Sequence, residues 1–247
     1  MKTSKNTILV TGGGSGIGQA LAHRLHDAGN TVIIAGRRLD VLQKAAEGRA
    51  NIVPVELDIS SQASIDAFAR KIVTDHPALN VLVNNAGIMR MEKLDHARDL
   101  TDAEETITTN LLGPIRLINA LVDHLVTQPD AVIINNTSGL AYVPLVPTPT
   151  YSATKAGLHS YTVALRVALK GKVEVIEIVP PAVQTSLTPG QDTREGYMPL
   201  PEFADEVLAL LQSQPTPAEV LVKRVYFLRN AEKENRFDEA LTTLNSH

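Results

Sequence analysis

Three side chains in the middle of the chain have the types and the spacing that proton transfer requires: Ser138, Tyr151 and Lys155. Tyr151 and Lys155 are four residues apart, so in a helix they lie on one face. A free phenol has a pKa of about 10, and a nearby ammonium group favours the phenolate and lowers that pKa. The pair is therefore a candidate proton donor or acceptor for a carbonyl compound or an alcohol. Taken alone, this spacing is also typical of a core tyrosine beside a lysine whose charged end reaches solvent.

A glycine-rich segment near the start of the chain has the pattern of a phosphate-binding turn. Residues 7–18 read TILVTGGGSGIG, an apolar run followed by closely spaced glycines. Leu21, Leu25 and Ala28 then recur at helical spacing, and Gly29 can end that helix. Glycines let the backbone approach a pyrophosphate, and the helix N-terminus presents free N–H groups to it. A strand, a glycine turn and a helix in this order predict a dinucleotide site.

These motifs together resemble a known enzyme family. The glycine spacing is T-G-x-x-x-G-x-G, through Thr11, Gly12, Gly16 and Gly18. With Ser138 and Tyr151-x-x-x-Lys155, it resembles the short-chain dehydrogenase/reductase family. The sequence Asn-Asn-Ala-Gly at 84–87 is similar to that family's NNAG turn, and segments 178–187 and 219–245 resemble the DltE-type oxidoreductases within it. One departure is Pro181, which stands where the family usually has glycine after the sixth strand.

The resemblance implies a role for each matching residue. Tyr151 would exchange a proton with the substrate oxygen, Ser138 would hold that oxygen, and Lys155 would lower the pKa of Tyr151 and bind the nicotinamide ribose. Asn110 matches the fourth catalytic position, which holds a water beside the lysine, and Thr185 matches the position that binds the carboxamide. The cofactor contacts it implies are Gly12, Ser15, Gly16, Ile17, Gly18, Arg37, Arg38, Asp58, Ile59, Asn85, Ala86, Gly87, Tyr151, Lys155, Pro181, Val183 and Thr185.

The end of the second strand predicts which nicotinamide cofactor is used. NAD-binding enzymes usually carry an acid here, which bonds the ribose 2′-hydroxyl. This chain has Gly36 at that position, followed by Arg37 and Arg38. A guanidinium group binds phosphate in two-pronged fashion, so the sequence favours NADP(H) over NAD(H). The alternative is that both arginines are solvated charges at the start of a helix.

Hydrophobic periodicity predicts an α/β fold, a doubly wound Rossmann fold with a parallel sheet of about seven strands and helices on both faces. We expect one domain over 1–247, with a lid over the substrate at 185–200 and a capping box at Thr101–Glu104. Expected strands lie near 7–10, 31–35, 52–57, 80–83, 131–135, 173–179 and 219–225. Expected helices lie near 16–28, 38–46, 61–76, 101–126, 151–170, 200–212 and 228–244.

Bulk properties exclude several other classes. The 247 residues are 44% hydrophobic with a net charge of −4 and no basic stripe, which argues against a nucleic-acid partner. We find no apolar run long enough to span a membrane and no signal-peptide pattern, and we expect a cytoplasmic protein. There is no cysteine, and His23 and His26 lack a carboxylate at ligand spacing, so no metal site is expected. The apolar helices near 101–126 and 151–170, with Leu111, Ile115, Leu158 and Leu165, predict a homodimer or homotetramer.

The sequence therefore predicts an NADP(H)-dependent oxidoreductase that reversibly reduces a ketone or aldehyde to an alcohol. Leu140, Tyr142 and Val143 are candidate apolar walls of the substrate pocket. Two other classes stay open. One is a nucleotide-sensing regulatory protein that uses the fold without chemistry; the other is a sugar-nucleotide epimerase or dehydratase, which also uses a tyrosine–lysine pair.

Overall fold

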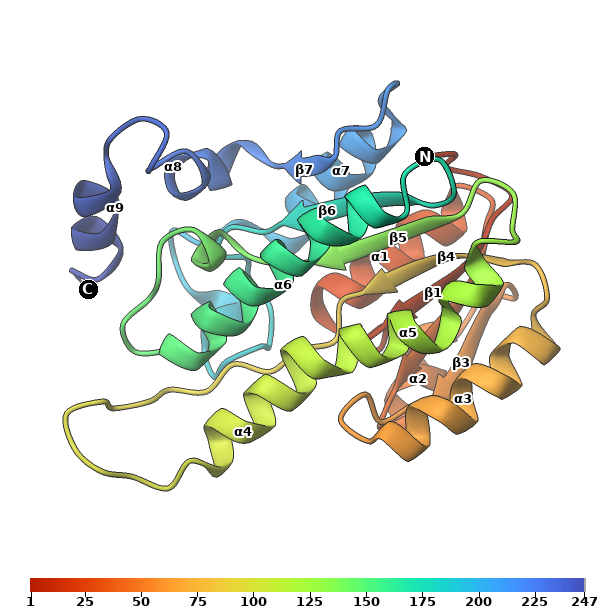
Figure 1. The fold of residues 1–247 in the computed structure, drawn as a ribbon, viewed down its shortest axis with the longest axis horizontal. Helices are drawn as coiled ribbons and strands as arrows, with labels where there is room; N and C mark the ends of the chain where they lie inside the picture. Colours follow the sequence, from red (N-terminus) through yellow and green to blue (C-terminus); the bar gives the residue numbers. More distant parts are fainter. Residues whose placement is uncertain (247) are drawn as a thin grey trace.

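The computed structural model describes residues 1–246, and in these residues seven parallel strands form one sheet (Figure 1). The order across the sheet is β3-β2-β1-β4-β5-β6-β7. The strands are β1 (Thr7–Thr11), β2 (Thr31–Gly36), β3 (Ile52–Glu56), β4 (Leu79–Asn84), β5 (Val132–Asn136), β6 (Glu174–Val179) and β7 (Glu219–Leu221). Most of their residues are buried, as expected for a parallel sheet covered on both faces.

Helices cover the two faces of the sheet and bury two apolar cores. Helices α1, α2 and α7 pack on one face, around Ile8 and Val10 of β1. Helices α3, α5 and α6 pack on the other, around Leu9 of the same strand, which follows from the alternation of side chains along a strand. The helices are α1 (Gly16–Asp27), α2 (Leu39–Ala46), α3 (Gln62–Asp75), α4 (Thr101–Ile107), α5 (Gly113–Leu125), α6 (Pro149–Ala168), α7 (Leu200–Gln212), α8 (Tyr226–Arg229) and α9 (Phe237–Leu244).

The sheet confirms the predicted doubly wound fold. The first three strands run outward from β1 in one direction and the last four run outward from β4 in the other, so the switch point lies between the neighbouring strands β1 and β4. In such sheets, the loops beyond the carboxyl ends of the strands part at this switch point and leave a crevice for a ligand. The glycine turn follows β1 and the Asn84–Gly87 segment follows β4, so both lie at that crevice. No helix among residues 1–246 is long and apolar enough to cross a membrane.

Two local predictions are wrong, and the helix predicted over 101–126 forms as far as Leu125 with one irregularity. The expected last helix, 228–244, is two helices, because the chain turns between α8 and α9 with Asn235 at φ +55°, a conformation that asparagine tolerates. The expected helix 101–126 contains a π-helical turn at Thr108–Leu112. The capping box does not form: the first backbone N–H of α4, that of Thr101, donates instead to the Asp99 carboxylate, at 3.0 Å.

Candidate active site

A cavity of about 890 Å³ runs along the switch-point crevice and collects most of the predicted site residues. The predicted residues that line it are Gly12, Ser15, Gly16, Ile17, Arg37, Arg38, Asp58, Ile59, Asn85, Ala86, Gly87, Ser138, Leu140, Tyr151, Lys155, Pro181, Val183 and Thr185. Gly18, Asn110, Tyr142 and Val143 do not line it. The cavity therefore joins the glycine turn at one end to the serine, tyrosine and lysine at the other.

The glycine turn is packed too closely for side chains. A Cβ atom on Gly18 would lie 2.3 Å from the carbonyl oxygen of Gly12, so α1 begins in direct contact with the turn. Gly16 has a φ of +53°, which favours glycine. Ser15 precedes α1 and its side chain does not cap the helix. The first N–H groups of a helix have no partner inside it, so this turn offers donors and a positive dipole end to an anion.

The end of β2, beside the glycine turn, carries two exposed arginines and no acidic residue. Arg37 and Arg38 are exposed and line the cavity, and Gly36 lies at the end of β2. A Cβ atom on Gly36 would lie 3.8 Å from its nearest neighbour, a Leu42 methyl carbon, so the position has room for a side chain. Beside it, after the neighbouring strand β3, the hydroxyl of Ser60 donates to the Asp58 carboxylate and, with help from Arg37, lowers the pKa of Asp58.

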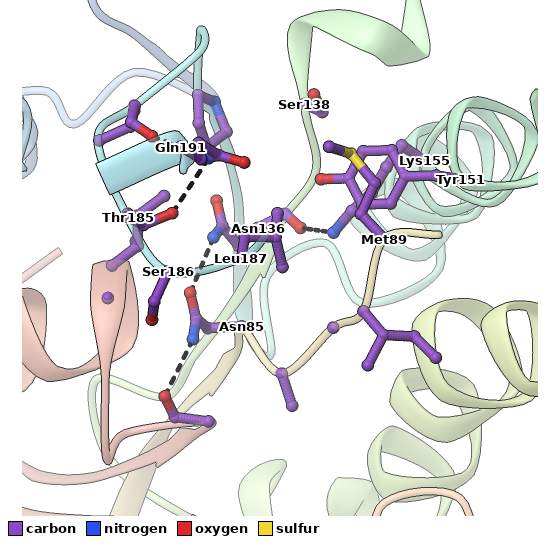
Figure 2. A pocket seen from close by; sticks show the side chains of 18 of the residues that line it. Asn85, Met89, Asn136, Ser138, Tyr151, Lys155, Thr185, Ser186, Leu187 and Gln191 are labelled. Carbon is purple, nitrogen blue, oxygen red and sulfur yellow. Dashed lines mark hydrogen bonds between the residues drawn. The ribbon is translucent and has the colours of Figure 1, made fainter. Parts of the chain in front are cut away.

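Ser138, Tyr151 and Lys155 come from two neighbouring elements and meet at the other end of the cavity (Figure 2). Ser138 follows β5, and its hydroxyl accepts a hydrogen bond from the N–H of Leu140 at 3.1 Å, which starts a 3₁₀ turn over Gly139–Ala141. Tyr151 and Lys155 lie in the first two turns of α6, and all three side chains are buried. The Lys155 ammonium donates to the carbonyl of Asn136 at 2.8 Å and lies 5.5 Å from the centre of the Tyr151 ring.

The pKa of Tyr151 departs from the sequence prediction. Burial raises the pKa of Tyr151 to about 12, and the hydrogen bond with Ser138 opposes this rise only in part. The lowering of this pKa expected from Lys155 is not what the structure gives: burial disfavours the phenolate, and the opposing effect comes from Ser138. Burial also lowers the pKa of Lys155 to about 8. At neutral pH, Tyr151 thus holds its proton and can donate it.

Asparagine side chains connect the glycine turn to the lysine. The amide of Asn136 donates to Asn85 at 2.8 Å, and the amide of Asn85 donates to the carbonyl of Thr11 at 3.0 Å (Figure 2). The Thr11 hydroxyl in turn accepts from the N–H groups of Asn85 and Ala86. The buried Oδ1 of Asn136 has no hydrogen-bond partner. A buried acceptor without a partner costs free energy, so a ligand donor that reaches Asn136 would be stabilised there.

Asn110 lies behind the cavity, in the π-helical turn. Its side chain bonds both backbone groups of Ile88: the carbonyl oxygen accepts from the N–H at 2.9 Å, and the amide donates to the carbonyl at 2.8 Å. The side chain is therefore occupied in holding the loop after β4. The residue four positions later is Pro114, which has no N–H to donate to the Asn110 carbonyl. The Asn110 backbone oxygen therefore lacks the usual i+4 donor and can accept a hydrogen bond from a water.

The segment expected to be a lid begins and ends in backbone hydrogen bonds. The N–H of Met198 donates to Ala182 and the N–H of Gln184 donates to Met198, so the two ends are joined. Between them, Gln191 is buried and its amide donates to the Thr185 hydroxyl at 3.1 Å (Figure 2). Sequence reasoning missed Gln191, because nothing in an irregular loop marks which polar residue turns inward.

A buried acid, Glu92, holds the start of α6. Its carboxylate accepts from the N–H of Thr150 at 3.1 Å and from the Thr150 hydroxyl at 2.7 Å, and Arg98 pairs with it. The Glu92 side chain is 1% exposed. Thr150 immediately precedes Tyr151, so Glu92 fixes the helical turn that carries the tyrosine. The sequence offered no signal for this contact, which spans 58 residues.

Two residues expected in the substrate pocket, Tyr142 and Val143, do not line the cavity, whereas the C-terminal segment does. Val143 is fully buried in a small cluster with Ala231 and Ala240, and the Tyr142 hydroxyl faces His159; neither reaches the cavity. Because Val143 anchors the C-terminal segment, that segment crosses the substrate end of the crevice. The C-terminal segment supplies lining residues that the sequence did not predict: Arg224, Phe227, Leu228, Thr243 and Leu244.

Comparison with known proteins agrees with this geometry. A family model described as short chain dehydrogenase matches residues 6–196. A relative named "Uncharacterized oxidoreductase DltE", from Bacillus subtilis, is 41% identical over 79% of each chain. A short chain dehydrogenase from Burkholderia cenocepacia in complex with NADP superposes with a TM-score of 0.82, at 25% identity over 98% of each chain. A 3-ketoacyl-(acyl-carrier-protein) reductase from Brucella melitensis, complexed with NADH, does so with a TM-score of 0.77, at 25% identity over 90% of this chain and 95% of that one. The chain thus belongs to the short-chain dehydrogenase family and is an NAD(P)-dependent oxidoreductase.

Proposed function

We propose that this protein is an NADP(H)-dependent reductase that reversibly converts a ketone or aldehyde to an alcohol. The observation that supports this most directly is the placement of Ser138, Tyr151 and Lys155 in one cavity with the glycine turn. A hydride acceptor bound beside Tyr151 is then within reach of both a proton donor and a dinucleotide that extends to the turn. Positioning of this kind supplies much of the rate enhancement in enzymes.

The residues present fit a dinucleotide with a 2′-phosphate. The free N–H groups at the start of α1 suit the pyrophosphate, and the unpartnered Oδ1 of Asn136 leaves an acceptor near the nicotinamide end. Arg37 and Arg38 suit the 2′-phosphate, and Gly36 leaves no carboxylate to repel it. These features support NADP(H) over NAD(H).

When bound, the nicotinamide supplies or accepts the hydride. Tyr151 gives its proton to the carbonyl oxygen as negative charge develops on it, and its raised pKa keeps the phenol protonated until then. The Ser138 hydroxyl keeps its proton and donates a hydrogen bond to the same oxygen, which holds that oxygen in place. Lys155 binds the ribose, and its ammonium favours the tyrosinate left after proton transfer. The Asn110 carbonyl holds a water that returns a proton towards Lys155.

The substrate end of the cavity favours a carbonyl compound with an apolar body. Its walls carry aliphatic, thioether and aromatic side chains: Met89, Met91, Leu140, Leu145, Leu187, Phe227, Leu228 and Leu244. Burial of such side chains against a ligand contributes about 25 cal/mol per Å². The segment 185–200 acts as the lid, with Thr185 held by Gln191 to meet the carboxamide. We assign lid and site to one domain spanning 1–247.

Tyr151→Phe tests the mechanism. This change keeps the ring and its packing and removes the transferable proton. We expect NADPH-dependent reduction to fall by about 10²–10⁴-fold, with NADPH affinity unchanged, because the phosphate contacts lie at the other end of the cavity. The measurements are NADPH fluorescence titration and steady-state turnover across a panel of ketones and aldehydes. Near-normal turnover by a folded, NADPH-binding Tyr151→Phe protein would contradict the proposal, and turnover of nucleotide sugars alone would favour an epimerase or dehydratase.

A further inference from the structure

A second buried carboxylate lies outside the cavity, between the two elements that carry the catalytic groups. Glu177 is on β6 and its side chain is 0% exposed. Its carboxylate accepts from the Thr137 hydroxyl at 2.7 Å and from the Tyr142 hydroxyl at 3.3 Å. Nδ1 of His159 lies 2.8 Å and 3.0 Å from its two oxygens. A buried carboxyl group costs free energy unless it is hydrogen-bonded, and these three side chains supply those bonds to Glu177.

The partners of Glu177 belong to two catalytic elements. Thr137 immediately precedes Ser138, and Tyr142 follows the 3₁₀ turn that begins there, so the carboxylate bonds both ends of the serine loop. His159 is on α6, one turn beyond Lys155 and two beyond Tyr151. Residues at positions i, i+4 and i+8 share a helix face, and Figure 1 shows α6 lying along β6. Glu177 is therefore a shared hydrogen-bond partner of the loop that carries Ser138 and the helix that carries Tyr151.

Other charged groups complete the cluster. Arg229 of α8 bonds Glu219 of β7 through two nitrogens, at 2.7 Å and 3.0 Å, and its guanidinium lies 4.5 Å from the centre of the Tyr142 ring. The hydrogen bond to Glu177 raises the pKa of His159, which favours the imidazolium. His159, Glu177 and Glu219 lie close enough to ligate a metal ion. Arg229 already occupies both oxygens of Glu219, however, so the arrangement is that of paired ions.

We infer that Glu177, together with His159 and Tyr142, is a positioning residue that fixes the distance between the Ser138 hydroxyl and the Tyr151 hydroxyl. This inference rests on the proposed function, because it assigns the carboxylate a role only if both hydroxyls act on one substrate oxygen. Lys155 of α6 already bonds the Asn136 carbonyl at 2.8 Å, and the Glu177 cluster adds a second set of polar contacts one helical turn further on, at His159. Hydrogen bonds from three side chains to one carboxylate restrict movement of the loop against the helix, and a misplacement of about 1 Å costs on the order of 10²-fold in rate.

The test compares Glu177→Gln, His159→Gln, the double variant and Tyr142→Phe with wild type. Each single change is close in shape to the original side chain, and Tyr142→Phe removes only one hydroxyl. His124→Gln is the matched control, since His124 also bonds through its ring, to the Leu79 carbonyl, but lies on α5 outside the cavity. The measurements are kcat and KM for an accepted ketone, NADPH affinity by fluorescence, and the pKa of His159 by NMR.

We expect Glu177→Gln and His159→Gln to lower kcat by roughly 10–100-fold, with NADPH affinity within twofold of wild type. The double variant should be no slower than the slower single variant, because the two residues act as one unit. Tyr142→Phe should lower kcat less, and the pKa of His159 should fall in Glu177→Gln. Wild-type kcat in both single variants, multiplied losses in the double variant, or equal losses of kcat and NADPH affinity would overturn the inference.

Wild type and Tyr151→Phe are measured in the same assay, so that a failure of the positioning role of Glu177 can be told apart from a failure of the proposed function. If Tyr151→Phe is inactive and the Glu177 and His159 variants are as fast as wild type, only the positioning role is wrong. If Tyr151→Phe retains normal turnover, the proposed mechanism itself is wrong. The His159 titration reports on the ion pair without any substrate, so it remains informative in either case.

Discussion

Replacement of Glu92 by alanine should destabilise the protein and lower its turnover, because Glu92 holds the first turn of the catalytic helix. The change removes the acceptor of the Thr150 N–H and hydroxyl and leaves Arg98 without its partner. Loss of a helix cap costs about 1 kcal/mol, and breaking a buried ion pair costs about 3–5 kcal/mol. Arg98 is 18% exposed and can turn partly to solvent, so we expect a total of about 2–4 kcal/mol.

For a chain of this length, that loss corresponds to a fall in Tm of roughly 5–15 °C. The assay is thermal unfolding by circular dichroism, with kcat measured well below the transition. Turnover should fall while NADPH affinity is retained, since Thr150 is adjacent to Tyr151 and remote from the glycine turn. Glu92→Gln keeps one acceptor oxygen without the charge and should lie between wild type and alanine.

Asp205→Asn provides the control, because Asp205 pairs with Arg24 at 2.7 Å but is 70% exposed. An exposed pair contributes about 0–1 kcal/mol, so this variant should unfold within a few degrees of wild type. A Glu92→Ala protein with a Tm within about 2 °C of wild type and unchanged kcat would refute the assignment of Glu92 as the anchor of α6.

Four further changes test the remaining assignments. Gly36→Asp should shift the cofactor preference from NADPH towards NADH by at least about tenfold in kcat/KM, or 1.4 kcal/mol, since the position has room for a side chain. Arg37→Asp should shift the preference in the same direction. A wild-type protein that uses both cofactors equally would contradict the assignment of NADP(H). NADPH affinity should fall as pH rises through about 8, because Lys155 loses its charge there. The Lys155→Met protein should bind NADPH weakly and show no such pH dependence. If the variant keeps the same pH dependence, another group is responsible for it. Val163→Asp on α6 should convert a dimer or tetramer to monomers, as measured by light scattering. The reason is that Val163 and Val167 are exposed apolar side chains on a helix that packs beside α4. A wild-type protein that is monomeric at micromolar concentration would contradict oligomerisation.

The parts of the site that sequence predicted are those whose chemistry is local. The glycine turn depends on close backbone approach within a few residues, so its spacing is visible in the sequence. The face that Tyr151 and Lys155 share is also visible in the sequence, because it depends only on a spacing of four residues within one helix. The predicted oligomer residue Leu158 shows the limit of this approach: periodicity placed it on α6, but it is 1% exposed and packs within its own chain, so it cannot contact a second subunit.

The parts that sequence did not predict depend on contacts between distant segments. The acid Glu92 lies in an irregular loop, and only the folded chain brings it to Thr150. The sequence pattern predicts one helix over 228–244, whereas Asn235 takes a left-handed conformation and turns the chain between α8 and α9. Consequently Phe227 and Leu244 reach the cavity from a segment whose position no local pattern encodes.

Two buried carboxylates, neither of them in a family motif, therefore determine how the motif residues meet. Glu92 fixes the turn of α6 that contains Tyr151, and Glu177 links the middle of that helix to the loop that carries Ser138. Each carboxylate is buried and so requires its full set of donors, which makes its position less tolerant of displacement than an apolar contact. Because proton transfer needs donor and acceptor within hydrogen-bond reach, these two acids constrain the chemistry without touching the substrate. Their loss should then appear in kcat and leave NADPH affinity, which depends on the glycine turn, largely intact.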